Sequence, residues 1–227
     1  MRKTSIALLA LAGSVASFGA NATLVSINNC VGANSCEITT TPPNPVVPNP
    51  NNGILLAWDE VQNFTLTEPL RVDRVFDPTA DFITDLGNGD FLINAGTIVS
   101  SHYLQWDPGN SSASTVTATI ILDSQVFAFI TADQNLFDSD DLLGLPSLDY
   151  NDFGLRGLES GDLTDFSGEN VDIRWNASSP GDWTRLITAF SPSAPDPDPT
   201  PVPEPSTFVL LTAGLLGLLA YAWRKRK

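Results

Sequence analysis

The chain is poor in the residues on which most enzyme active sites depend. Its 227 residues include one histidine, two cysteines and one methionine. A Ser-His-Asp triad would have to use His102, because the chain has no other imidazole. The Gly-x-Ser-x-Gly elbow, the P-loop and the His-Glu-x-x-His zinc motif are absent. We therefore expect His102 to be structural, and we expect a protein that is not an enzyme and requires no cofactor.

Basic residues are also scarce where acidic ones are common. All 26 acidic residues lie between Glu37 and Glu204, a span that holds five arginines and no lysine. The negative charge of this span repels nucleic acid and anionic lipid and attracts cations, so no nucleic-acid partner is expected. Carboxylate pairs for glycoside hydrolysis are defined by a separation of about 5 to 9 Å in space and leave no fixed spacing in sequence. An exported glycan hydrolase therefore stays open as an alternative.

The first 22 residues have the three parts of a secretory signal peptide. Arg2 and Lys3 form a basic start, Ile6 to Val15 an apolar stretch, and Ala20-Asn21-Ala22 a small-residue cleavage site. The mature chain is expected to begin at Thr23. The segment predicts export from the cytoplasm.

An uncharged segment near the C-terminus is long enough to cross a membrane. Residues 206–223 carry no charge, and a helix of this length extends about 27 Å, close to the thickness of a bilayer core. The basic residues Arg224 to Lys227 favour the cytoplasmic side. We expect a single transmembrane helix over 206–223 that holds the precursor in the inner membrane, with the preceding chain outside.

The motif Pro203-Glu204-Pro205 precedes this hydrophobic segment and its basic end. In this order, residues 203–227 resemble the PEP-CTERM sorting signal of Gram-negative bacteria. The resemblance implies an exosortase as processing partner, with Pro203, Glu204 and Pro205 as the processing motif. It also implies delivery to the cell surface or extracellular matrix, usually in cells that make exopolysaccharide. A plain membrane anchor after a proline-rich linker is the alternative.

The two cysteines, Cys30 and Cys36, are expected to form a disulfide. Export to an oxidising compartment favours pairing over two free thiols. The bridge would close a small loop and stabilise it by about 2 kcal/mol. The spacing is not Cys-x-x-Cys, which disfavours a redox role.

Two proline-rich stretches bound a central segment. Residues 40–52 and residues 191–202 each hold five prolines, which predicts extended linkers. The expected division is a signal peptide at 1–22, a disulfide-stapled N-terminal segment with its linker at 23–52, one domain at 53–190, a second linker at 191–202 and the sorting signal at 203–227.

The central segment has the pattern of an all-β domain. Its apolar runs are short, rich in β-branched and aromatic residues, and separated by turn signals such as Asn-Gly and Pro-Gly. We expect a single β-sandwich, jelly-roll or Ig-like, with one short helix near Asp140 to Leu143. The expected strands are Ile54 to Trp58, Phe64 to Leu66, Leu70 to Phe76, Phe91 to Ile93, Thr97 to Ser100, Tyr103 to Trp106, Thr115 to Leu122, Val126 to Thr131, Val171 to Trp175 and Trp183 to Thr188.

One acidic run is a candidate metal site. Asp133, Asp138, Asp140 and Asp141 lie within nine residues of one another, and carboxylate oxygens on a loop are what Ca²⁺ selects. The run lacks the glycine and the final glutamate of an EF-hand. Solvated acidic side chains without an ion are the alternative.

Four tryptophans of the domain permit two interpretations. Trp58, Trp106, Trp175 and Trp183 could form a platform that stacks on sugars, or they could form the core of a small sandwich. The sequence favours an exported, non-enzymatic surface or matrix protein associated with exopolysaccharide. A carbohydrate-binding module is the first alternative.

Overall fold

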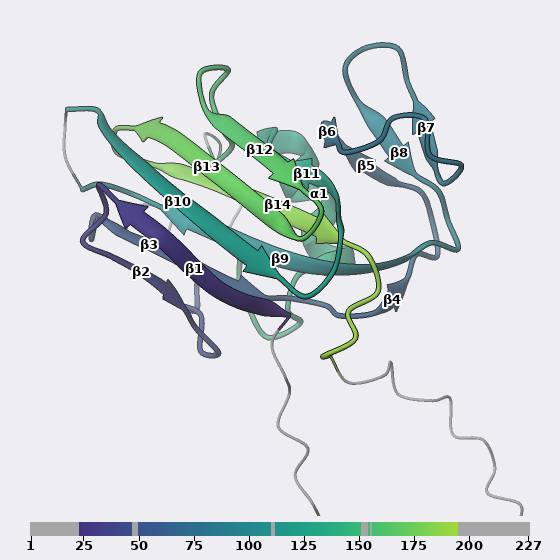
Figure 1. The fold of residues 1–227 in the computed structure, drawn as a ribbon, viewed down its shortest axis with the longest axis horizontal. Helices are drawn as coiled ribbons and strands as arrows, with labels where there is room; N and C mark the ends of the chain where they lie inside the picture. Colours follow the sequence, from purple (N-terminus) through teal and green to yellow (C-terminus); the bar gives the residue numbers. More distant parts are fainter. Residues whose placement is uncertain (1–22, 47–49, 110–111, 151–153, 155, 195–227) are drawn as a thin grey trace, which may run out of the picture.

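The computed structural model describes residues 23–46, 50–109, 112–150, 154 and 156–194. These residues form fourteen strands and one α-helix, which confirms the all-β class. The strands are arranged in three sheets (Figure 1).

The first sheet has four antiparallel strands in the order β1-β10-β13-β12. In β10, Val116, Ala118 and Ile120 are buried and the threonines between them are not, as the alternation in sequence predicts. This sheet therefore has one dry face and one wet face. Its strands are β1 Leu24–Val31, β10 Ser114–Leu122, β12 Leu163–Ser167 and β13 Asn170–Ala177.

The second sheet has seven strands, six of them in the order β2-β3-β9-β14-β11-β6, while β4 pairs separately with β9. All seven residues of β14 are buried, because this sheet is covered on both faces. The pairing of β2 with β3 is parallel, and the other pairings are antiparallel. The strands are β2 Ser35–Ile38, β3 Ile54–Asp59, β4 Phe64–Thr65, β6 Arg74–Val75, β9 Ile98–Trp106, β11 Val126–Ile130 and β14 Asp182–Thr188.

The third sheet and the helix are smaller. Strands β5 Leu70–Val72, β8 Phe91–Ile93 and β7 Ile83–Asp85 form an antiparallel sheet at the upper right of Figure 1. The helix α1, Asp133–Leu143, packs its buried Leu136 and Leu143 toward the seven-stranded sheet. Among the described residues no helix is long and apolar enough to span a bilayer. The expected transmembrane helix 206–223 lies outside the described residues.

Two hydrophobic cores hold these layers together. The first lies between the two larger sheets, with Val116 and Trp175 on one side and Leu104 and Trp106 on the other. The second lies on the opposite face of the seven-stranded sheet, where Trp58 and Trp183 pack with residues of α1 and the small sheet. All four domain tryptophans are at most 1% exposed, so the core interpretation is correct and they cannot form a sugar platform.

The folded unit begins earlier than the boundary at residue 53 that we expected from the sequence. Strands β1 and β2 precede that boundary, yet each pairs with a strand of a larger sheet. The proline-rich stretch is also partly packed, since Val46 is 3% exposed and the Asn44 amide donates to the Ser147 carbonyl over 2.7 Å. The proline content of residues 40–52 predicted an extended linker, because proline restricts the backbone but carries no information about tertiary contacts.

Candidate functional site

A buried arginine organises the space between α1 and the seven-stranded sheet. Arg185, in the middle of β14, is fully buried and donates from Nε and Nη2 to the two carboxylate oxygens of Glu60, over 2.6 and 2.8 Å. Its Nη2 also lies 3.0 Å from Oδ1 of Asp140 on α1. The guanidinium carbon lies 5.3 Å from the Tyr103 ring centroid, within the range of a cation–π contact. Arg185 therefore ties the helix to the sheet.

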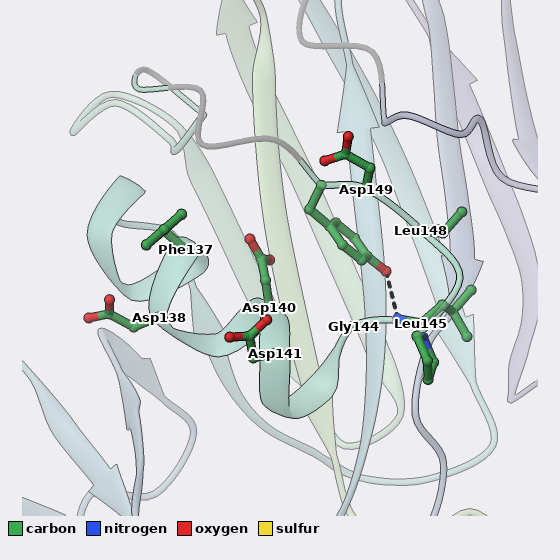
Figure 2. Close-up of a pocket in the computed structure, with 10 residues that line it drawn as sticks. Phe137, Asp138, Asp140, Asp141, Gly144, Leu145, Leu148 and Asp149 are labelled. Atoms are coloured by element: carbon green, nitrogen blue, oxygen red, sulfur yellow. Dashed lines mark hydrogen bonds between the residues drawn. The ribbon is translucent and has the colours of Figure 1, made fainter.

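The four aspartates of the candidate calcium site lie on α1 and not on a loop. Asp140 is held by Arg156, whose Nη2 donates to both of its oxygens over 2.9 and 2.8 Å, as well as by Arg185. Asp138 instead accepts from the Gln134 amide over 2.7 Å. Figure 2 shows Asp138 and Asp140 directed to different sides of the helix. The expected loop is thus a helix, and within the described part of the chain no three of the four aspartates bring ligand oxygens within 4.8 Å of one another.

A cleft of about 800 Å³ lies beside the C-terminal half of α1 (Figure 2). Phe137, Asp138 and Asp141 line it from the helix, and Asp149 lines it from the segment that follows. The hydroxyl of Tyr150 accepts a hydrogen bond from the Leu145 amide over 3.0 Å, which holds the opposite wall. Phe137 is 51% exposed, so the cleft combines an accessible aromatic ring with carboxylates.

The single histidine is enclosed. His102, on β9, has no exposed surface, and its Nδ1 lies 2.6 Å from Oδ1 of Asp59. Its Nε2 lies 3.1 Å from the Thr188 hydroxyl, and the Thr23 hydroxyl lies 3.0 Å from Nδ1. Burial raises the pKa of the Asp59 carboxyl, but the hydrogen bond and charge of His102, with Thr23 and Leu24, bring that pKa below its ordinary value. The arrangement locks strands together and gives a substrate no access to the imidazole.

Cys30 and Cys36 form the expected disulfide, with a Cα–Cα distance of 6.2 Å. Cys30 lies on β1, at the edge of the four-stranded sheet, and Cys36 lies on β2, at the edge of the seven-stranded sheet. The bridge therefore joins the edges of two different sheets.

The structure brings together three carboxylates that were not predicted from the sequence. Glu159, Asp162 and Asp182, called the three-acid cluster below, place one oxygen each within 4.8 Å of the others. Glu159 and Asp162 precede β12, whereas Asp182 begins β14. Only the folding of these strands brings the residues together, so no local spacing could reveal the cluster.

The environment of Asp182 disfavours its charged form. Burial, and after it the nearby carboxylates of Asp162, Glu159 and Asp107, together raise the pKa of the Asp182 carboxyl to about 9. Gly181, which precedes Asp182, lets the chain lie directly against Trp106 and Asp107 at the end of β9. A Cβ at that position would meet the Trp106 carbonyl oxygen at 2.4 Å, and its φ of +110° lies in a region that side chains rarely adopt.

Comparison with known proteins recognises the C-terminal end of the chain. Residues 201–227 match the family described as the PEP-CTERM protein-sorting motif. Pro203, Glu204 and Pro205 fall inside this match and outside the described residues. The chain gave no match among curated proteins and none among solved structures. The recognised feature of the chain is therefore its sorting signal, and it does not extend to the β domain.

Proposed function

We propose that this chain is an exported protein that an exosortase processes at its C-terminal signal, and that its β domain is a non-enzymatic structural component of the cell surface or extracellular matrix. The match of residues 201–227 to the sorting motif carries the proposal. The signal peptide at 1–22 and the transmembrane helix at 206–223 belong to it. The proposal also includes a precursor held in the inner membrane, a Gram-negative host and an association with exopolysaccharide.

The chemistry of the domain interior supports a structural role. Three polar groups of types common in active sites, His102, Arg185 and Glu60, are at most 4% exposed. His102 is hydrogen-bonded to Asp59, and Arg185 is hydrogen-bonded to Glu60. Buried charged networks of this kind hold a fold together only while every member is paired. We also propose that the two larger sheets form a β-sandwich, because they share one hydrophobic core.

Processing can be tested in a native host and in an isogenic strain that lacks the exosortase. We expect the wild-type host to release or re-anchor a shortened protein at the surface. The deletion strain should instead accumulate the full-length chain in the inner membrane. Identical mass and location in the two strains would contradict the proposal.

Glycan binding is a second candidate, and the cleft beside α1 favours it. An exposed aromatic ring beside carboxylates can stack on a sugar and accept hydrogen bonds from its hydroxyls. Replacing Phe137 by Ala should then abolish binding on an array of bacterial polysaccharides. Phe190, which is 44% exposed and does not line the cleft, supplies the control substitution to Ala. Equal array signals from both variants would exclude this cleft as the binding site.

A further inference from the structure

Asp182 is a buried carboxylate without a donor. The residue has no exposed surface, and neither of its carboxylate oxygens accepts a hydrogen bond from any of the described residues. A buried polar group left unpaired costs about 1 to 3 kcal/mol, and more when it is charged. A native fold that keeps such a group has a reason to do so, and an unrecorded ion is one of the usual reasons.

The neighbouring carboxylates are satisfied differently. Asp162 accepts the Glu159 amide over 2.8 Å and the Asn176 amide over 2.7 Å, one on each oxygen. Asp107 likewise accepts amides on both oxygens, from Asn51 and Gly109. These backbone donors fix the two carboxylates in place but leave lone pairs free on each. No such donor reaches either oxygen of Asp182, whose polar contact within the cluster is the carboxyl group of Glu159.

No basic side chain neutralises the cluster. Across the part of the chain that the structure describes, no Lys, Arg or His nitrogen lies within 4.0 Å of a carboxylate oxygen of Glu159, Asp162 or Asp182. Arg74 approaches closely, but its Nη1 donates to the main-chain carbonyl of Asp162 over 3.3 Å. Arg174 lines the adjoining cleft without reaching the carboxylates. A positive charge that balances the ionised cluster would therefore have to come from solution.

The cluster also has an entrance. A cleft of about 660 Å³ is lined by Glu159 and Asp162 together with Thr115 and Asn176. Glu159 is exposed at this opening, Asp162 is 4% exposed, and Asp182 is fully buried. The three acids thus run from the solvent inward, which gives an ion a path and leaves room for water on its open side.

We propose that the three-acid cluster binds a calcium ion, with Glu159, Asp162 and Asp182 as protein ligands and water from the cleft completing the coordination. Ca²⁺ takes six to eight oxygen ligands at about 2.3 to 2.6 Å, so two of its ligands can lie up to about 5 Å apart. The separations within 4.8 Å meet this limit. The site is independent of the sorting function and uses none of the aspartates of α1.

The test uses the full-length chain in detergent, stripped with EGTA and titrated with CaCl₂ by calorimetry and thermal unfolding. We expect saturable binding and a melting temperature that rises more in CaCl₂ than in NaCl of equal ionic strength. Asp182→Asn and Glu159→Gln should each weaken calcium binding by at least about tenfold. Glu159 lies at the open end of the cluster, so its substitution tests binding even if Asp182→Asn perturbs folding.

Two controls locate the ion. Glu68→Gln removes an exposed carboxylate elsewhere, and the double variant Asp138→Asn/Asp141→Asn removes two carboxylates of α1; both should bind calcium as the unsubstituted chain does. Equal thermal shifts in CaCl₂ and NaCl would overturn the proposal. So would unchanged affinity in Glu159→Gln and Asp182→Asn, loss of binding only in the α1 variant, or tighter binding of Mg²⁺ than of Ca²⁺.

Discussion

Arg185 and Glu60 form a two-point ion pair in which neither side chain has exposed surface. The pair joins β14 to the segment after β3, and Asp140 and Ser139 extend it to α1. The helix is therefore attached to the sheet by charge as well as by its leucines.

Replacing Glu60 by Gln should lower the free energy of unfolding by about 3 kcal/mol, because it leaves a buried guanidinium short of a counter-charge. Urea denaturation measures the change. Glu68→Gln, at an exposed position, should stay within about 0.5 kcal/mol of the unsubstituted chain. The double variant Glu60→Leu/Arg185→Met should lose less free energy of unfolding than the sum of the losses in Glu60→Leu and Arg185→Met measured singly. Additive losses would show that the two residues do not act as a pair.

Asp59 should contribute to acid stability through His102. Because the pKa of this carboxyl is lowered on folding, its contribution is complete above the unfolded value near 4 and is lost as the pH falls through the folded value. Urea denaturation between pH 6 and pH 2 should show a steeper loss for the unsubstituted chain than for Asp59→Asn. The exposed Asp81→Asn serves as the control. Parallel curves for all three proteins would exclude this contribution.

Asp182 should have the opposite effect. Its pKa is raised to about 9, so the ion-free folded chain binds a proton that the unfolded chain releases near pH 4. In EGTA the free energy of unfolding should therefore fall as the pH rises from about 4 to about 9. The charged groups around Asp182 are the carboxylates of Glu159, Asp162 and Asp107, and Arg174 lines the adjoining cleft. Asp182→Asn should flatten this slope, whereas Asp141→Asn should not. An unchanged slope in Asp182→Asn would show that another group titrates.

The disulfide should stabilise the association of the two larger sheets. Replacing Cys30 and Cys36 together by Ser should lower the free energy of unfolding by about 2 kcal/mol, the value expected for a short closed loop. Hydrogen exchange should increase first at β1 and β2, the edge strands that the bridge joins. Without reductant, mass spectrometry should find one linked peptide. Two alkylated thiols in the exported protein would contradict the assignment.

The strands that sequence predicted well are those whose burial alternates or whose apolar run is continuous. Thr115 to Leu122 alternates along β10, and Trp183 to Thr188 lies fully buried in β14, nearly as expected. β1 was missed because its sequence, with Asn28 and Asn29 among the apolar residues, resembles a turn. It becomes a strand because β10 offers it an edge to pair with.

The helix and the three-acid cluster show a different limit. The acidic run after Asp133 suggested a loop, but Leu136 and Leu143 lie two turns apart and bury one face against the sheet. The three-acid cluster forms only because the fold brings Asp182 next to Glu159 and Asp162, which lie at least 20 positions earlier in the chain. Local patterns predict elements, whereas sites of this kind arise from the pairing of elements.

The C-terminus of the processed protein tests the central claim most directly. Mass spectrometry of the protein from an exosortase-bearing host should find that it ends near Pro203-Glu204-Pro205 and lacks Lys227. Replacing those three residues by Ala leaves the hydrophobic segment intact, so the variant should keep Lys227 and accumulate in the inner membrane. If the unsubstituted protein keeps Lys227 and the substitution changes neither mass nor location, the tail is an anchor alone and the account of sorting is wrong.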